Sequence, residues 1–574
     1  MMFRYRCLIL FFLGMKWWAP VFAQSPLLPE YNQEFHMMQR WIIKGKTPRT
    51  PPGFSHEIER ISLYSTLDTF AHRDTSADDT RPEILSRDTS YLQREIASLS
   101  RYTATAPIQP KKKGWRSYFY PYPTALFHKE SDTYYFQLNP ILRLSGGQYK
   151  EHASSRSILE NTRGFEVEGA FDHRFFFYSR ILETQRHLLP NEMNFLNTYH
   201  AIPHEGSFKP FESRYSPGSK GVDFNGSIGY FGIQVSPSLQ VKIGQGRHFI
   251  GSGYRSLLLS DFGKDYFYGQ MDWRLGPLFY RNIYSSMVAR THQDLNKDAL
   301  LPKKYMAAHV LGLNLPYGIQ IALYEAVIHT RNNRFELSYL NPIIFYKSLE
   351  FNLGSPDNVL IGGDARWDVA HRFNLYGQLV IDEFNLTYLK QYQRGWWANK
   401  FGIQLGAFYP DALGIRHLDL RIEYNFVRPY TYSHRDSIRS YAHYNQPLAH
   451  PWGANFKELI TSIRYQPSHH WNLDLSWISG CRGLDKSGEN NGSNILISHL
   501  YHVTPFGNFV CQGELHQINW LSFNLSYMFL HHYYLDMKWL RRYEMVEDRP
   551  GVSDGFTYLS IGIRANIAMN SFNF

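Results

Sequence analysis

The sequence has 574 residues, a net charge of +10, a mean hydropathy of −0.39 and 19% charged residues. No apolar stretch after residue 23 approaches the roughly 20 residues that a membrane-spanning helix needs, which excludes a helical membrane protein. Aromatic residues still make up 16% of the chain, and this fits either a β-barrel with aromatic girdles and a polar lumen or a soluble all-β carbohydrate binder.

The first 23 residues have the pattern of a secretion signal. Arg4 and Arg6 give the positive start, residues 7–14 the apolar core, and residues 21–23 a small-residue exit. Removing this segment takes away Arg4, Arg6 and Lys16 and lowers the net charge from +10 to +7. A basic surplus favours anionic partners such as acidic polysaccharide or lipid head groups. No basic run exceeds residues 111–113, so no nucleic-acid partner is expected.

Residues 24–130 differ from the rest of the chain. Tyr31, Phe35, Met38 and Ile42 recur at helical spacing and Gly45 ends the pattern, which predicts a helix. A second candidate helix covers residues 90–99, and a basic linker follows at 110–114. We expect a short periplasmic helical segment, with a partly disordered segment as the alternative.

From about residue 134 the hydrophobic period changes to two. The alternating segments are 165–171, 373–381, 418–426, 471–477 and 559–567. In one of them, Leu420, Ile422 and Tyr424 alternate with Arg421 and Glu423. Such strands need an apolar medium on one face and water on the other, which both a membrane barrel and a soluble sandwich supply.

The connections between these strands favour the barrel. Short connections lie at 172–173, 236–238, 276–277, 316–318, 370–371 and 467–470, and long ones between them at 190–220, 250–264, 329–358, 386–399, 429–456 and 480–517. Short turns alternating with long outer loops are typical of an up-and-down barrel, whereas a Greek-key sandwich has no reason to produce them. We therefore predict an all-β membrane barrel, an up-and-down antiparallel outer-membrane β-barrel of about 18 strands.

The predicted organisation is a signal peptide at 1–23, a helical segment and linker at 24–130, and a transmembrane barrel at 131–574, with the long loops facing the cell exterior. Outer-membrane lipid and the barrel-assembly machinery are expected partners, and the terminal aromatic Phe574 fits the usual assembly signal. Cys481 and Cys511 remain after signal removal, in a compartment where they could form a disulfide or stay as two free thiols.

The long loops combine aromatic rings with Arg, Asn, Gln and Asp, which is the chemistry of sugar recognition. The alternative is that the tryptophans belong to the interfacial belt and the loops pack on each other. The candidate polysaccharide contacts are Arg247, Tyr254, Arg255, Asp261, Asp357, Trp396, Trp397, Arg428, Tyr430, Tyr432, His434 and Gln446.

The sequence contains few residue patterns that are typical of a catalytic site. Asp382 and Glu383 are adjacent on a strand and should point to opposite faces, so they make no carboxylate pair. No metal-ligand spacing and no phosphate-binding motif is found, so we expect no enzyme, cofactor or metal. Ser256, Asp261 and His248 keep an outer-membrane hydrolase as a lesser alternative.

Residues 247–262, 341–358, 376–384, 395–400 and 427–453 resemble the Wzi family of outer-membrane capsule-assembly barrels, and within it the RemB-like proteins associated with gliding motility. The resemblance implies an eighteen-stranded barrel with a small periplasmic helical bundle. It also implies a non-catalytic role in holding capsular or exopolysaccharide at the cell surface, or in adhesion and motility. A porin-like channel and a component of a motility or secretion machine remain alternatives.

Overall fold

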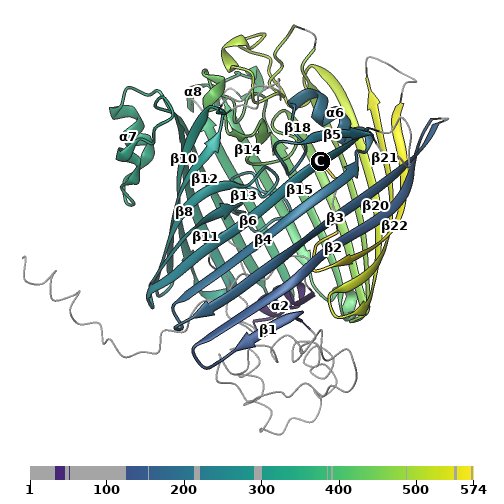
Figure 1. Cartoon of the computed structure of the whole chain (residues 1–574). Helices are drawn as coiled ribbons and strands as arrows, with labels where there is room; N and C mark the ends of the chain where they lie inside the picture. The colour runs from purple at the N-terminus through teal and green to yellow at the C-terminus, as the bar shows by residue number, and fades with distance from the viewer. Residues whose placement is uncertain are drawn as a thin grey trace, which may run out of the picture.

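The computed structural model describes residues 33–45, 51, 53, 124–152, 154–212, 220–289, 300–383, 386–389, 392–486, 488–547, 553–569 and 573–574. Within these residues, eighteen antiparallel strands form one closed barrel (Figure 1). The predicted signal, the second candidate helix and the basic linker at 110–114 lie outside the described residues.

The wall strands are β2 (Tyr134–Glu151), β3 (Ser154–Phe171), β4 (Phe175–His187), β6 (Lys220–Ser236), β7 (Leu239–Gly246), β8 (Tyr266–Leu275), β9 (Leu278–Val288), β10 (Lys303–Asn314), β11 (Ile319–His329), β12 (Asn358–Val369), β13 (Phe373–Glu383), β14 (Lys400–Tyr409), β15 (Leu418–Val427), β18 (Phe456–Ser468), β19 (Trp471–Leu484), β20 (Glu514–Leu530), β21 (Tyr533–Val546) and β22 (Ser553–Ala565). The connections and flanking segments hold β1 (Phe127–Glu130), β5 (Lys209–Glu212), β16 (Ala442–His443), β17 (Gln446–Pro447), the helices α2 (Gln33–Ile43), α6 (Pro190–Tyr199), α7 (Tyr346–Asn352) and α8 (Leu386–Leu389), and the 3-10 turns η2 (Pro316–Gly318), η3 (Leu337–Leu340), η4 (Tyr392–Arg394), η5 (Ala412–Gly414), η6 (Ser437–Arg439) and η7 (His499–Tyr501). None of the helices in these described ranges is long and apolar enough to cross a membrane.

The strand pattern separates an apolar outside from a polar lumen. In β12, the outward-facing Ile361 and Trp367 are 36% and 46% exposed, whereas the inward-facing Asp364, Arg366 and Asp368 are buried. Arg366 and Asp368 pair at 3.1 Å, so the buried charges compensate each other. An apolar wall around a polar interior is the arrangement of a membrane barrel, and the predicted eighteen-stranded fold is confirmed.

The predicted alternation of connections holds with two exceptions. β21 and β22 are joined at the long-loop end by only residues 547–552. β2 and β3 are joined at the long-loop end by only residues 152–153, where the sequence pattern predicts a long loop. β2 and β3 are 18 residues each, and their hairpin extends the wall at the long-loop end (Figure 1). The strands themselves therefore take the place of a long loop.

The barrel closes where β22 pairs with β2, from Leu142↔Ala565 to Glu151↔Phe556. Below this seam the edge of β2 is covered by β1, which pairs with residues 135–138. An unpaired backbone N–H or C=O in lipid costs several kcal/mol. β1 therefore satisfies part of the strand edge that β22 does not reach.

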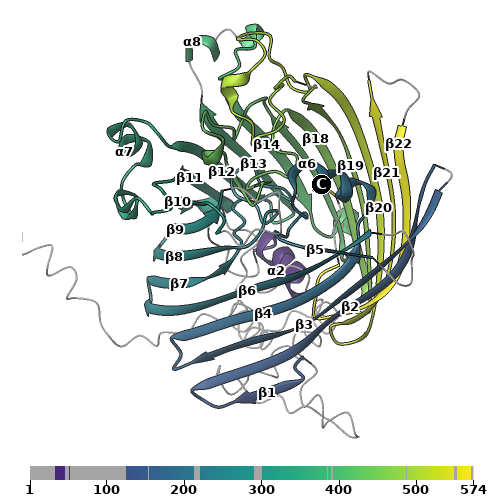
Figure 2. The same cartoon turned by 45° about the horizontal axis from the view of Figure 1, so that its top comes forward.

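Helix α2 lies inside the barrel near the short-turn end (Figures 1 and 2). Met38 and Ile42 are almost fully buried, as the helical spacing predicts, and Met37 is buried as well. Arg40 forms an ion pair of 3.1 Å with Asp419 of the wall, and both side chains are buried. The helix is thus attached to the lumenal wall instead of forming a separate bundle below it.

The last residues of the chain also enter the lumen. β22 ends at Ala565, and Phe574 packs against Phe195 of α6 and Phe262, with ring centroids 5.6 and 5.7 Å apart. Arg255 donates a hydrogen bond to the carbonyl of Asn573. The terminal aromatic is therefore not the end of the last strand in the folded barrel, and its part in an assembly signal stays a prediction.

Candidate functional site

The loop between β7 and β8, residues 247–265, folds into the lumen. Its apolar centre contains Ile250, Leu257, Leu258 and Leu259, all at most 1% exposed. Ser256 holds this turn, because its hydroxyl donates to the carbonyl of Ile250 at 2.5 Å and accepts from the N–H groups of Leu258 and Leu259. Burying these leucines between wall strands fixes the loop inside the barrel.

Inward-facing carboxylates of the wall hold the same loop. Glu423 accepts hydrogen bonds from the backbone N–H groups of Tyr254 and Arg255 at 2.6 and 3.0 Å. Arg255 pairs with Glu458 at 3.3 Å, and His450 lies 2.7 Å from the same carboxylate. Two predicted sugar contacts, Tyr254 and Arg255, are therefore also anchors of the lumenal plug.

The loop between β15 and β18, residues 428–455, packs on this plug. The buried Arg428 donates to the carbonyls of Asn399, Trp396 and Asn508 at 2.6, 3.1 and 3.2 Å, and so ties three connections together. Tyr430 donates to the carbonyl of Asn490 at 2.8 Å. Hydrogen bonds from a charged donor are among the stronger ones in proteins.

Two further predicted contacts in this loop bind the protein itself. Tyr432 is fully buried and donates to the carbonyl of Leu257 at 2.7 Å. Gln446 accepts from the N–H of His204 at 2.9 Å and is also fully buried. The loops thus pack on each other, as one of the two sequence interpretations proposed, while a role in sugar binding stays a prediction for these residues.

The other predicted contacts are dispersed. Asp357 is buried and accepts two hydrogen bonds from Arg331, at 2.8 and 2.7 Å, on the connection between β11 and β12. Arg247 pairs with Asp265 at 3.0 Å and donates to the carbonyl of the exposed Asp261. The structure therefore does not gather the twelve candidates into one site.

Trp396 and Trp397 are half-buried at the long-loop end and belong to an aromatic shelf, which we define as Tyr388, Trp396, Trp397, His502 and Phe506. Trp397 stacks on His502 with centroids 4.4 Å apart and planes 13° apart, and Tyr388 lies 4.5 Å from Trp396. Loop-borne His502 and Phe506 come from residues 485–513, where no sequence pattern had singled them out.

Two buried histidines lie beside the shelf. Burial, with the charge of Lys400 nearby, lowers the pKa of His434 to about 4. Burial and Lys400 also lower the pKa of His499, whose Nδ1 lies 3.3 Å from the Lys400 ammonium. Both imidazoles are therefore neutral at pH 7, so the predicted contact His434 offers no positive charge to a ligand.

The contacts of Lys400 also differ from the expectation that Asp382 and Glu383 point to opposite faces of their strand. The carboxylates of Asp382 and Glu383 both reach the Lys400 ammonium, at 3.3 and 3.1 Å, although strand alternation predicts opposite faces. A register shift between Ile381 and Glu383 interrupts the alternation at the end of β13. The pair is satisfied by one cation and forms a structural ion-pair cluster.

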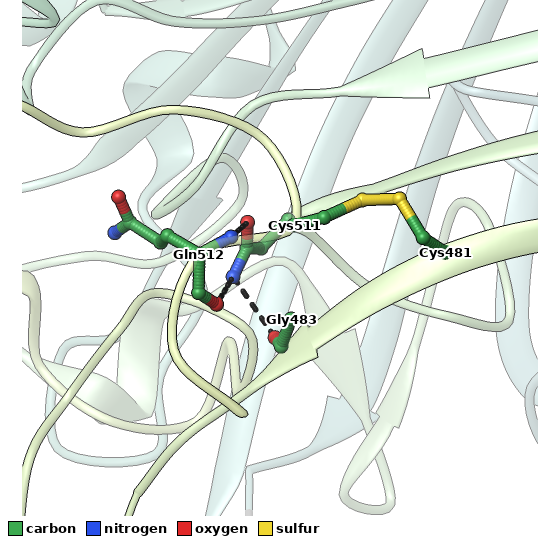
Figure 3. Close-up of a disulfide and its surroundings, with 5 residues drawn as sticks. Cys481, Gly483, Cys511 and Gln512 are labelled. Carbon is green, nitrogen blue, oxygen red and sulfur yellow. Dashed lines mark hydrogen bonds between the residues drawn. A yellow bond between two sulfur atoms is a disulfide. The ribbon is translucent and has the colours of Figure 1, made fainter. Parts of the chain in front are cut away.

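A disulfide fixes the connection that carries His499 and His502. Cys481 of β19 is bonded to Cys511, which settles the choice left open by the sequence (Figure 3). Next to it, the amide of Asn455 donates to the carbonyls of Gly483 and Gln512, both at 2.9 Å. The bond closes a loop with a sequence separation of 30, and cross-links of this span contribute about 3–4 kcal/mol in the chain-entropy model.

A cavity of about 590 Å³ opens beside α6, at the long-loop end of β2, β3, β21 and β22. We call it the α6 cavity. Its polar and aromatic lining residues are Tyr149, Glu151, Arg156, Ser157, His187, Asn191, Asn194, Asn197, Arg542 and Phe556. The volume lies within the about 300–1,000 Å³ range of small-molecule sites.

Helix α6 places three carboxamides along this cavity. Asn191, Asn194 and Asn197 recur every three residues and share one helix face. The helix begins at Pro190, and the Glu192 carboxylate accepts from the N–H of Leu189 at 3.0 Å, which fixes its first turn. Sequence reasoning took this segment as a long loop, although proline followed by glutamate two residues later is a helix-start signal.

The cavity also has an aromatic side and an unsatisfied polar atom. Tyr149 and Phe556 are buried and lie edge to face, 6.3 Å apart. His187 is 5% exposed, its Nδ1 accepts from the N–H of Leu159, and its Nε2 has no hydrogen-bond partner among the described residues. Rings beside this imidazole nitrogen and the exposed carboxamides of Asn194 and Asn197 are a suitable environment for hydroxyl-rich ligands.

The hydrolase alternative finds no support in the geometry. His248 directs its two ring nitrogens to Tyr266 and Gln270, each at 3.0 Å, while Ser256 donates to the Ile250 carbonyl. The Ser256 proton is thus not directed to the imidazole as a triad requires. Among the described residues, no group of three or more His, Cys, Asp and Glu is placed to hold a metal ion.

No protein-family model and no curated protein matches the sequence. Among solved structures, the chain is similar to Wzi of Escherichia coli, an outer-membrane protein involved in group 1 capsule assembly and a carbohydrate-binding β-barrel. The TM-score is 0.51 at 11% identity, over 95% of this chain and 100% of Wzi. OprD of Pseudomonas aeruginosa has a TM-score of 0.40 at 10% identity, over 75% of this chain and 92% of OprD. OccAB4 of Acinetobacter baumannii has 0.38 at 8%, over 75% and 97%.

Of these three similarities, the one to Wzi alone exceeds a TM-score of 0.5, and at 11% identity it shows the fold. The chain thus has a Wzi-like barrel. The closed wall, with apolar side chains on its outer face, supports an outer-membrane location.

Proposed function

We propose that this barrel binds surface polysaccharide, capsular or exopolysaccharide, at its long-loop end and takes no catalytic part. The α6 cavity carries the proposal, because it combines three carboxamides, two arginines, a histidine and two rings in a space of sugar-ligand size. The Wzi structure, described as a carbohydrate-binding barrel, has the same architecture and makes polysaccharide the first ligand to test.

The net charge of +7 after signal removal favours an acidic polymer. Long loops at the cell exterior would place the cavity where such a polymer is found. A link to adhesion or gliding motility rests on the sequence resemblance, and motility or secretion components are further candidate partners.

The test compares polymer retention by the folded barrel and its variants in lipid nanodiscs. Replacing both Asn194 and Asn197 with alanine removes two exposed carboxamides from the cavity and should weaken retention about tenfold, since each hydrogen bond contributes about 0.5–1.5 kcal/mol. Thr198→Ala is the matched control, because Thr198 is exposed on the same helix and does not line the cavity.

Trp396→Ala tests the aromatic shelf in the same assay. Loss of retention in Trp396→Ala with normal retention in the asparagine variant would move the site from the cavity to the shelf. Normal retention in both variants, or no retention of any capsule-type polymer by the wild type, would contradict the proposal.

A further inference from the structure

The connection between β11 and β12, residues 330–357, packs on the outer face of the barrel. We call it the outer flap; it contains η3 and α7 and projects beside the wall (Figures 1 and 2). Its buried tyrosines Tyr339 and Tyr346 pack on Ala307, Val327 and Val359 of the wall.

The wall residues under the flap face outward. In β10 and β11, Ala307 and Val327 belong to the same alternating rows as Leu311 and Leu323, which are 41% and 59% exposed on the outer face. The flap therefore covers the upper part of a surface whose lower part is the apolar outside of the barrel.

Polar groups on this outward surface are satisfied by the flap. His309 and Glu325 form a pair of 3.0 Å, and Glu325 also accepts from the N–H groups of Tyr346 and Lys347, both at 2.8 Å. The Tyr346 ring stacks on His309 with centroids 4.4 Å apart. A carboxylate on the lipid face of a barrel is costly unless it is covered, so the flap removes that cost.

The flap exposes several large apolar side chains. Six of them are exposed: Leu337 72%, Leu340 44%, Ile343 85%, Phe345 51%, Phe351 76% and Leu353 38%. So many exposed large apolar side chains on one connection are unfavourable in water and indicate a binding surface.

We propose that the outer flap lies in the outer part of the lipid bilayer, with these six side chains in contact with lipid. The flap covers the wall directly above the outward-facing Leu311 and Leu323, which lie only two residues below His309 and Glu325 in the strands. Lys347, which is exposed on α7, would reach the head groups, where cationic ends of side chains are favourable. The proposal is independent of polysaccharide binding.

Spin-label accessibility tests this placement in vesicles of phosphatidylcholine and phosphatidylglycerol. Ile343→Cys and Phe351→Cys are labelled with a nitroxide, while the native Cys481 and Cys511 are occupied by their disulfide. Collision rates are measured with oxygen, which concentrates in lipid, and with a water-soluble nickel chelate. Leu323→Cys serves as the lipid-facing control, and Leu300→Cys, at a position 97% exposed between β9 and β10, as the aqueous control.

We expect the ratio of oxygen to nickel collisions at positions 343 and 351 to approach that at Leu323 and to exceed that at Leu300 several-fold. A ratio equal to that at Leu300 would place the flap in water and overturn the proposal. Low collision rates with both reagents, accompanied by dipolar broadening or cross-linked dimers, would also overturn it by showing that protein covers the flap. All four side chains are exposed, so their replacement should leave the barrel folded.

Discussion

Arg428 illustrates how side chains of the long loops are used. Its guanidinium is 1% exposed and donates to carbonyls of residues 396, 399 and 508, which belong to two other connections. A buried arginine with this many acceptors is a connector between loops. Its removal would leave several carbonyls without a donor, each at a cost of about 1–3 kcal/mol.

His434 and His499 make the loop cluster sensitive to pH. Burial lowers the pKa of both, to about 4 for His434, from an ordinary value near 6.5. The neutral form is favoured in the fold, so we expect the contribution of these two imidazoles to stability to be complete above pH 6.5 and to be lost as the pH falls toward 4. A nitroxide on Tyr501→Cys, at a 73% exposed position, should become several-fold more mobile over this interval.

The measurement is the electron paramagnetic resonance line shape between pH 7.5 and 4. The double variant His434→Gln, His499→Gln is the control and should show a much flatter profile, because Lys400 and Glu383 remain but the two imidazoles no longer titrate. An unchanged profile in the double variant would assign the transition to other groups.

Residue identity alone predicted where the long loops are but not what their side chains do. Trp396 and Trp397 are half-buried, while Arg428, Tyr432 and Gln446 are turned inward, yet all share the same loop composition. An Arg, Tyr or Gln side chain can form hydrogen bonds either with a sugar or with a backbone carbonyl or amide of a neighbouring loop. The composition of the loops therefore cannot show which of the two the side chain binds. That distinction depends on tertiary packing.

The strands and α2 follow closely from their sequence periods, because a wall between lipid and water imposes alternation on each strand separately. The hydrophobic period of α2 could not predict that the helix lies inside the lumen. That placement depends on Arg40 meeting Asp419, 379 residues further along the chain. Helix α6 was missed because it is short and has a weak apolar pattern, with polar Asn191, Asn194 and Asn197 on one face.

Two segments contact the inner wall at different depths, and from this we expect almost no conductance. α2 occupies the short-turn end, and residues 247–265 occupy the centre, where the Gly251 N–H donates to the carbonyl of Gly53 at 2.7 Å. In planar bilayers, we expect deletion of residues 24–53 to leave the barrel nearly closed. Combining it with a short glycine-serine replacement of residues 250–260 should produce steady channels. Steady conductance by the wild type would favour the porin alternative.

The charge of the whole molecule leads to a further expectation about the ligand. If the polymer is acidic, its retention by this basic protein, with a net charge of +10 for the full sequence, should fall steeply between 0.1 and 1 M salt, as the screening length shortens from about 10 to about 3 Å. A neutral glucan of similar length is the control and should show little dependence. Salt-independent retention of the acidic polymer would show that the arginines of the cavity contribute little.

The pairing of β22 with β2 has a consequence for biogenesis. Every other neighbouring pair in the wall is also adjacent among the wall strands in the sequence, so the sheet can grow hairpin by hairpin with short loop closures. The last pairing instead joins residues more than 400 positions apart, such as Leu142 and Ala565. Because α2 and the lumenal loops are enclosed by this pairing, we expect them to enter the curved sheet before its two edges meet. The wall strands would then pair first, α2 and the lumenal loops would enter next, and β22 would pair with β2 last.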